Sequence, residues 1–301
     1  MTRARGAMAP PPRLPDRAVW MNGTMCRGED ATLSVFDRGA RDGEGLFETL
    51  RVDRGHPFLW ERHLERLVLG AAELGFPVPA SPATLRDALD QVLSAGGLDD
   101  AVVRITITRG VPGRHPTRTG NWVDAEPLTG RLWKGTRSGA AQAMVSRRPF
   151  APGSLGRYKT TSRLGYHLAR EEARAARVDE ALLVTRDGEL LEGAVSNLFV
   201  RRGDELRTPP LSSDVLPGIT RAWVIAHAAG VGLAVHERRL TVAELMDADE
   251  AFLTNSVQEI VPLAAVDGIA LRTGDAAREL LRRYRDEVER SLAAASESRR
   301  R

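Results

Sequence analysis

Lysine is almost absent from this chain, and its two lysines limit the covalent chemistry that the protein can perform. Among 43 lysines and arginines, only Lys134 and Lys159 are lysines. A Schiff base requires a lysine amine, because a guanidinium does not lose its proton. Lys134 stands in a polar connection and is expected to be solvated. Lys159 stands in GRYKTTSR, where a loop is expected to lead into a helix, and its retention in so arginine-rich a chain makes it the candidate nucleophile.

A carboxylate follows Lys159 further along the chain. Glu192 stands after two leucines in LLEGAVSNLFV, so its side chain is expected to be only partly solvated. Taken alone, Glu192 would be a turn acid whose oxygens accept from local amides. Together with Lys159, it suggests a carboxylate that keeps a heteroaromatic nitrogen protonated, as the electron sink of pyridoxal phosphate requires.

The helix that begins after the Pro-Gly pair of DVLPGITRAW offers a site for an anion. Ile219 and Thr220 occupy its first turn, where backbone N–H groups are free and the helix dipole favours negative charge. Arg66, in ERHLERL, would supply a bidentate charge to the same phosphate. The ordinary alternative for Arg66 is a solvated ion pair with a glutamate of its own helix.

Three short polar residues end an apolar strand in FLTNSVQEIVP. Thr254, Asn255 and Ser256 are either turn formers, which is their common role, or groups that present hydroxyl and amide atoms to a pocket at the sheet edge. Asp249 and Glu250 precede them, but no histidine or further acid stands at ligand spacing. We therefore expect no metal site.

Two units of α/β structure must position these residues, since 301 residues correspond to roughly two domains. The first is predicted as a small N-terminal α/β domain and the second as a large domain that carries Lys159 and Glu192. The predicted divisions are a flexible arm over 1–17, the small domain over 18–130, a connection over 131–142, the large domain over 143–295 and a charged tail over 296–301.

Hydrophobic alternation and helical spacing predict the elements within each unit. In the first unit, we expect irregular structure over 111–139, strands at 19–23, 31–36, 45–52, 56–60 and 102–110, and helices at 62–74 and 82–95. The first of these helices is expected to place Leu64, Leu67, Leu69 and Leu74 near one face. In the second unit, we expect strands at 143–146, 181–185, 194–201, 205–208, 233–237 and 250–254, and helices at 160–177, from 217, at 242–246 and at 275–295.

Charge and cysteine content exclude several classes of protein. The formal net charge is +3, yet the first seventeen residues carry +3 and Arg299, Arg300 and Arg301 carry another +3, so the remainder has a net charge of −3. That balance argues against a nucleic-acid partner. A single cysteine, Cys26, is typical of a reducing compartment, and the cytoplasm is expected. No apolar stretch has the length of a signal peptide or a membrane helix, so no membrane partner is expected.

The ordered motifs of this chain resemble those of the fold type IV pyridoxal-phosphate enzymes. This superfamily contains branched-chain and D-amino-acid aminotransferases and aminodeoxychorismate lyase. The resemblance covers about residues 18–270 and rests on DRGARDGEGLFETLRV, HLERL, YKTTSR, EGAVSNLF, LPGITR and TNSVQEIVP, in that order. It implies an α/β (α+β) fold with a small N-terminal α/β domain, a larger domain with a barrel-like sheet, and the cofactor between them. It also implies a homodimer, in which a loop of one subunit closes the site of the other.

The resemblance assigns roles residue by residue. It implies that Lys159 forms a Schiff base with pyridoxal 5'-phosphate and moves protons, and that Glu192 pairs with the pyridine nitrogen. It implies that the phosphate is held by Arg66, the backbone amides of Ile219 and Thr220, and Ser256. Whether Arg157 or Arg163 approaches the cofactor hydroxyl stays open.

The residues on the substrate side favour one branch of the superfamily. Thr49, in LFETLRV, and Asn255 stand where the lyase pattern has these residue types, although threonine in a strand and asparagine at a turn are also ordinary. Arg114 and His115 are similar to the Arg-x-His loop of D-amino-acid aminotransferases, but no residue separates them. Arg114 would hold a substrate carboxylate under either interpretation, and His115 is a weaker candidate.

The favoured prediction is a 4-amino-4-deoxychorismate lyase that forms 4-aminobenzoate and pyruvate for folate synthesis. Its catalytic residues would be Lys159 and Thr49, and its substrate a small amine that bears a carboxylate. The alternative is an aminotransferase of D-amino acids, branched-chain amino acids or (R)-amines.

Overall fold

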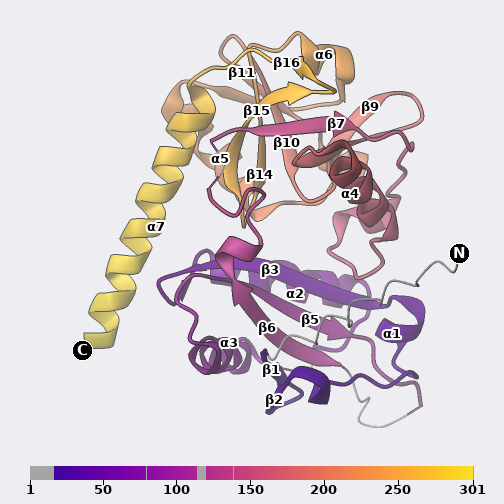
Figure 1. Ribbon diagram of the computed structural model, residues 1–301, viewed down its shortest axis with the longest axis vertical. Helices are drawn as coiled ribbons and strands as arrows, with labels where there is room; N and C mark the ends of the chain where they lie inside the picture. Colours follow the sequence, from indigo (N-terminus) through magenta and orange to yellow (C-terminus); the bar gives the residue numbers. More distant parts are fainter. Residues whose placement is uncertain (1–16, 79, 114–119, 138, 301) are drawn as a thin grey trace, which may run out of the picture.

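Two sheets, one smaller and one larger, form the two halves of the molecule (Figure 1). The computed structural model describes residues 17–78, 80–113, 120–137 and 139–300. The smaller sheet has six strands in the order β2-β1-β6-β5-β3-β4, and the larger sheet has ten strands. Of the larger sheet, nine strands follow the order β12-β11-β10-β14-β15-β7-β8-β9-β13, and β16 pairs with β15. The division of the chain into two domains at the predicted boundaries remains a prediction.

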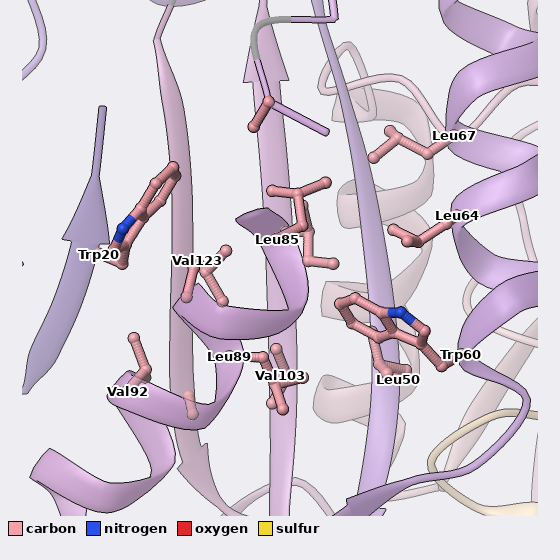
Figure 2. Close-up of a cluster of buried hydrophobic side chains, with 14 of the residues drawn as sticks. Trp20, Leu50, Trp60, Leu64, Leu67, Leu85, Leu89, Val92, Val103 and Val123 are labelled. Carbon is pink, nitrogen blue, oxygen red and sulfur yellow. The ribbon is translucent and has the colours of Figure 1, made fainter. Parts of the chain in front are cut away.

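The smaller sheet packs one face against two helices. Its strands are β1 (Ala18–Met21), β2 (Thr24–Arg27), β3 (Gly45–Asp53), β4 (His56–Pro57), β5 (Ala101–Thr108) and β6 (Asn121–Pro127), and its helices are α1 (Arg38–Asp42), α2 (Trp60–Glu73) and α3 (Pro82–Gly96). Figure 2 shows Leu64 of α2 and Leu89 of α3 pointing at Leu50 and Val103 of the central strands. Successive side chains of a strand point to opposite faces of the sheet. The side chains of Leu46, Glu48 and Leu50 on β3 therefore face α2, and those of Phe47 and Thr49 face the other side.

The structure corrects three expectations for this half. Residues 31–36 form no strand, and Val35 and Phe36 are 74% and 63% exposed; β1 pairs instead with β2, through a tight turn in which Asn22 and Gly23 both have positive φ. The stretch 111–139 is not wholly irregular, because β6 lies between β1 and β5. Leu69 is 55% exposed, since it lies about 140° around the helix from the buried Leu64.

The larger half wraps helices around a curled sheet. Its strands are β7 (Ala141–Val145), β8 (Glu180–Val184), β9 (Glu189–Gly193), β10 (Asn197–Arg202), β11 (Glu205–Thr208), β12 (Ala234–Glu237), β13 (Leu240–Thr241), β14 (Glu250–Asn255), β15 (Glu259–Val266) and β16 (Ile269–Ala270). Its helices are α4 (Leu164–Ala176), α5 (Ile219–His227), α6 (Val242–Met246) and α7 (Ala276–Arg300). None of the described helices is long and apolar enough to span a bilayer.

Two expectations for the larger half were also wrong in detail. The predicted strand 194–201 begins only at Asn197, because β9 ends at Gly193 and a turn separates the two strands. The segment FLTNSVQEIVP is a hairpin of β14 and β15. At its turn the Asn255 side-chain oxygen accepts hydrogen bonds from the Val257 and Gln258 amides, at 2.9 and 2.7 Å.

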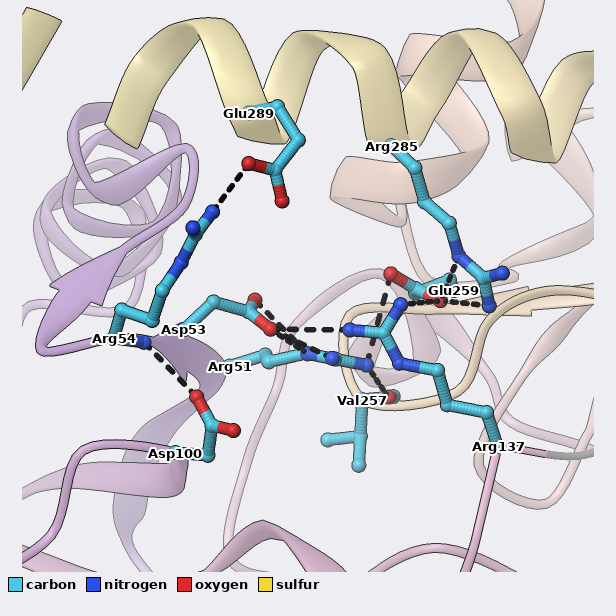
Figure 3. A network of polar contacts seen from close by, with 9 residues as sticks. All are labelled: Arg51, Asp53, Arg54, Asp100, Arg137, Val257, Glu259, Arg285 and Glu289. Atoms are coloured by element: carbon cyan, nitrogen blue, oxygen red, sulfur yellow. Dashed lines mark hydrogen bonds and ion pairs between the residues drawn. The ribbon is translucent and has the colours of Figure 1, made fainter. Parts of the chain in front are cut away.

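A cluster of charged side chains joins the two halves (Figure 3). Arg51 and Asp53 come from β3, Glu259 from β15, Arg285 from α7 and Arg137 from the connection before β7. The Glu259 carboxylate accepts from Arg285 Nη2 at 2.7 Å and lies 3.6 Å from Arg51 Nη1. This junction fixes β3 of the smaller sheet against the β14–β15 hairpin of the larger one.

Candidate active site

A cavity of about 190 Å³ lies where the two halves meet. Its lining includes every predicted site residue that the structure describes: Thr49, Arg66, Lys159, Glu192, Ile219, Thr220, Asn255 and Ser256. Arg114 and His115 lie outside the described residues. Arg163 also lines this cavity, whereas Arg157 lines a neighbouring apolar groove. Residues from six separated stretches of the chain thus come together at one place.

Lys159 is held by the backbone of β3. Phe47 N donates to the Lys159 carbonyl at 2.9 Å, and Thr161 N donates to the Gly45 carbonyl at 2.8 Å. The Lys159 Nζ atom lies 5.0 Å from the centre of the Phe47 ring. Burial, together with the nearby charges of Arg163 and Arg66, lowers the pKa of Lys159 to about 7. A large fraction of this amine is therefore uncharged and nucleophilic near neutral pH.

Glu192 is fixed from three sides at the end of β9. Its carboxylate accepts from Asn197 Nδ2 at 3.0 Å, from the Leu216 amide at 3.1 Å and from the Tyr166 hydroxyl at 3.3 Å. The side chain is buried, and burial raises the pKa of Glu192 to about 7 against the opposing charge of Arg163. A cationic group in the cavity would stabilise the ionised form of Glu192.

The first turn of α5 presents backbone donors to the cavity. The N-cap of this helix is Gly218, and no side chain of the described residues caps it. Both Ile219 and Thr220 line the cavity. Arg66 lies beside this turn, because its Nη1 donates to the Pro217 carbonyl at 2.9 Å. Thr254 also lines the cavity, and its buried Oγ1 has no hydrogen-bond partner among the described residues. These unsatisfied donors fit a group with several acceptor oxygens, such as a phosphate.

Glu48 and His63 connect two of the expected phosphate residues, and sequence reasoning missed both. The buried Glu48 carboxylate accepts from Arg66 Nε at 2.8 Å and Nη2 at 2.6 Å, and from His63 Nδ1 at 2.8 Å. His63 Nε2 lies 3.2 Å from Ser256 Oγ. Burial alone would raise the pKa of Glu48, but Arg66 and His63 hold it at about 2. The one available signal was an acidic residue inside the apolar strand GLFETLRV.

Arg66 and Asn255 each had an ordinary alternative role, an ion pair within its own helix and a turn former. Arg66 pairs with Glu48 of β3 at 2.6 Å, whereas Glu65 of its own helix pairs with Arg62 at 3.2 Å. Asn255 acts as a turn former through its side-chain oxygen, while the residue as a whole still lines the cavity.

Comparison with known proteins places this geometry in context. The Amino-transferase class IV family profile matches residues 45–266. The chain is 31% identical to the aminodeoxychorismate lyase of Bacillus subtilis (strain 168) over 286 residues, which cover 91% of this chain and 96% of that protein. It is 28% identical to a D-alanine aminotransferase of Bacillus licheniformis over 260 residues, which cover 85% of this chain and 90% of that protein.

Solved structures agree with the predicted fold class and confirm it. A branched-chain aminotransferase from Thermoproteus uzoniensis with norvaline superposes with a TM-score of 0.79 at 29% identity, covering 89% of this chain and 93% of that one. A T.th. branched-chain amino acid aminotransferase with pyridoxamine 5'-phosphate gives a TM-score of 0.79 at 28% identity, covering 90% of this chain and 94% of that one.

Proposed function

The chain belongs to the class IV aminotransferases, which are pyridoxal-phosphate-dependent enzymes, and from this premise we propose that it is a 4-amino-4-deoxychorismate lyase. The reaction would yield 4-aminobenzoate and pyruvate, in the direction of folate synthesis. The observation that carries the proposal is the position of Thr49, which lines the same cavity as Lys159 and Glu192. Threonine at this place is the feature of the sequence that favours a lyase.

The residues of the cavity would hold the cofactor at three points. Lys159 would bind it covalently, Glu192 would face its ring nitrogen, and its phosphate would meet Arg66, Ser256 and the first-turn amides of α5. When bound, the cofactor supplies an electron sink for the carbon that bears the substrate amine. Glu192, held by three donors, would keep the ring nitrogen protonated.

Two side chains would then handle protons and the leaving group. The Nζ atom of Lys159 would accept the proton from the substrate carbon that bears the amine. The Thr49 hydroxyl would donate a hydrogen bond near the departing enolpyruvate. Arg114 would hold a substrate carboxylate.

We also propose that the protein is a homodimer. We place it in the cytoplasm, because a single cysteine is typical of a protein from a reducing compartment.

An aminotransferase is the second candidate, because branched-chain aminotransferases are among the solved structures that superpose well. In that reaction Lys159 would move the abstracted proton a second time instead of leaving the carbon free to expel a group. The same cavity and the same residues would serve both reactions.

A spectroscopic titration distinguishes the two functions. The near-visible absorbance of the holoenzyme is followed while aminodeoxychorismate, D-alanine or leucine is added without a keto acid. A lyase forms 4-aminobenzoate and pyruvate over many turnovers while the absorbance persists. If an amino acid depletes the absorbance stoichiometrically, a keto acid restores it and aminodeoxychorismate stays unchanged, the protein is an aminotransferase and the lyase proposal is wrong.

A further inference from the structure

A chain of hydrogen bonds runs from a buried carboxylate to the wall of the cavity through one histidine. Glu48 of β3 and His63 of α2 are each 1% exposed, and His63 Nδ1 lies 2.8 Å from Glu48 Oε2. On the other side of the ring, His63 Nε2 lies 3.2 Å from Ser256 Oγ. Of these three residues, only Ser256 lines the cavity between the two halves. His63 therefore acts on the cavity through the Ser256 hydroxyl.

The ionised Glu48 fixes which ring nitrogen of His63 carries a hydrogen. Against burial, Arg66 and His63 hold the pKa of Glu48 at about 2, so its carboxylate can only accept hydrogen bonds. His63 Nδ1 must therefore be the donor to Glu48. A neutral imidazole with its hydrogen on Nδ1 has a bare Nε2, which can only accept. This assignment follows from the partners of the two ring nitrogens.

The protein groups around His63 favour its neutral form. Burial lowers the pKa of His63 against the hydrogen bond and the charge of Glu48, and the positive charges of Arg66 and Lys159 lower it further. Ser256 then donates its hydroxyl hydrogen to His63 Nε2. In this arrangement, the Ser256 oxygen offers only lone pairs to the cavity.

The other charged groups near His63 already face opposite charges. His63 and Ser256 line a small second cavity, whose other charged or titratable residues are Arg51, Asp53, Glu259 and Tyr284. Arg51 pairs with Asp53 at 2.6 Å and lies 3.6 Å from Glu259. Burial raises the pKa of the Tyr284 hydroxyl above its ordinary range, so this group stays uncharged. The charges that decide the protonation of His63 are therefore those of Glu48, Arg66 and Lys159.

A phosphate at Ser256 would face a hydroxyl oxygen whose hydrogen points away from it. Phosphate oxygens accept hydrogen bonds, and a hydroxyl that donates to His63 has none left to give. If the hydroxyl turned to the phosphate while His63 stayed neutral, the buried Nε2 would lose its donor, which is costly. A proton on Nε2 removes both difficulties, because Nε2–H then donates to Ser256 Oγ and the hydroxyl hydrogen is free for the anion.

We propose that His63 is a proton-linked positioning residue, which takes up one proton from the medium when a dianion binds at Ser256 and so reverses the direction of the Ser256 hydroxyl. The imidazolium then lies between the Glu48 carboxylate and the hydroxyl, and the anion offsets the nearby charges of Arg66 and Lys159. This inference rests on the proposed function in one respect, that the cofactor phosphate meets Ser256. Docking precedes covalent capture, so the uptake belongs to the non-covalent step and leaves the rate at saturating cofactor to the Lys159 amine.

Sulfate binding to the apoprotein tests this inference, because sulfate is a dianion that neither titrates near neutral pH nor reacts with an amine. Titration calorimetry in buffers with different heats of ionisation counts the protons taken up per bound sulfate. We expect the wild type to take up about one proton more than His63→Gln does. Its affinity for sulfate should also fall more steeply with rising pH, by up to about tenfold per pH unit. Lys159 titrates in both proteins, so its share cancels in the comparison.

The same substitution at another histidine is the matched control. His227 ends α5, the helix whose first turn faces the cavity, and its Nδ1 contacts the Trp223 carbonyl at 2.8 Å. His227→Gln should keep the uptake of the wild type. Nitrogen NMR of histidine-labelled wild type is a second measurement, which serves even if His63→Gln does not fold. Sulfate should convert His63, recognised by the slow exchange of its buried ring hydrogen, from the Nδ1–H form to the imidazolium.

The outcomes separate this inference from the proposed function. Equal proton uptake in the wild type and His63→Gln overturns the role of His63, as does a His63 ring that stays neutral with sulfate or is already charged without it. Sulfate that fails to slow the capture of pyridoxal phosphate also overturns it, since no anion would then bind at Ser256. Uptake that depends on His63, in a protein that leaves aminodeoxychorismate unchanged, would instead overturn the lyase proposal and leave the role of His63 intact.

Discussion

At the scale of single residues, the surroundings of Lys159 prepare one amine for covalent chemistry. Replacing Lys159 with alanine should abolish turnover and the near-visible absorbance of the bound cofactor. Lys134→Ala provides a matched control, since Lys134 is exposed and lies 3.5 Å from Asp179. Its absorbance and turnover should equal those of the wild type. A Lys159→Ala protein that still turned over substrate would contradict the role given to this residue.

The pKa of Lys159 makes a separate prediction about pH. An uncharged amine is the nucleophile, and its fraction rises as pH passes upward through the pKa of about 7 in the folded protein. The rate at which apoprotein captures pyridoxal phosphate should therefore rise between about pH 6 and pH 8 and then level off. Stopped-flow absorbance measures this rate. A rate that continues to rise toward pH 10.5 would indicate an ordinary, solvated lysine.

Glu48 is a positioning residue, because it touches Arg66 directly and Ser256 through His63. Glu48→Gln keeps the shape but removes the charge that Arg66 faces. We expect a loss of about 3 kcal/mol in the free energy of unfolding, the scale for breaking a buried pair, and weaker binding of the cofactor. Urea denaturation and equilibrium dialysis measure the two effects.

The control for Glu48 lies on the exposed face of α2, the helix that carries Arg66. Glu65 is exposed and pairs with Arg62, so Glu65→Gln should change stability by less than about 0.5 kcal/mol. Comparable cofactor affinity in Glu48→Gln and Glu65→Gln would show that Glu48 does not position the phosphate residues.

At the scale of elements, the start of α5 depends on a close approach to the β9–β10 turn. A Cβ at Gly218 would meet Asn197 Oδ1 at 2.0 Å, and Asn197 in turn donates to Glu192. Gly218→Ala should displace Asn197, loosen Glu192 and weaken cofactor binding, at a cost of about 1–3 kcal/mol in stability. Gly130→Ala is the control, because its Cβ would meet nothing within 4 Å. Equal cofactor affinity in the two variants would contradict this packing argument.

At the scale of the whole molecule, the charged junction holds the two halves together around the cavity. The Glu259 side chain is 2% exposed and faces Arg285, Arg51 and Arg137. Glu259→Gln leaves these arginines short of a counter-charge, so we expect a loss of about 3 kcal/mol in the free energy of unfolding.

The exposed pair of Glu289 with Arg54 at the same junction supplies the comparison. Glu289→Gln should cost less than about 1 kcal/mol, because exposed pairs contribute little. Urea denaturation of both variants measures the difference. If the two variants lose the same stability, the junction is not held by Glu259.

Elements with local signals could be predicted from the amino-acid sequence without the structure. The apolar run GLFETLRV predicted the strand β3, and the Pro-Gly pair before Ile219 predicted the start of α5. The order of motifs predicted one site for Lys159, Glu192 and Ser256. Which residues far apart in the sequence come into contact could be seen only in the folded structure. His63 and Ser256 are 193 residues apart, and nothing local to Glu48 indicates that its carboxylate will face Arg66. The hairpin at Asn22 and the strand β6 were missed for the same reason, since pairing across a sheet depends on neighbours that the local pattern does not contain.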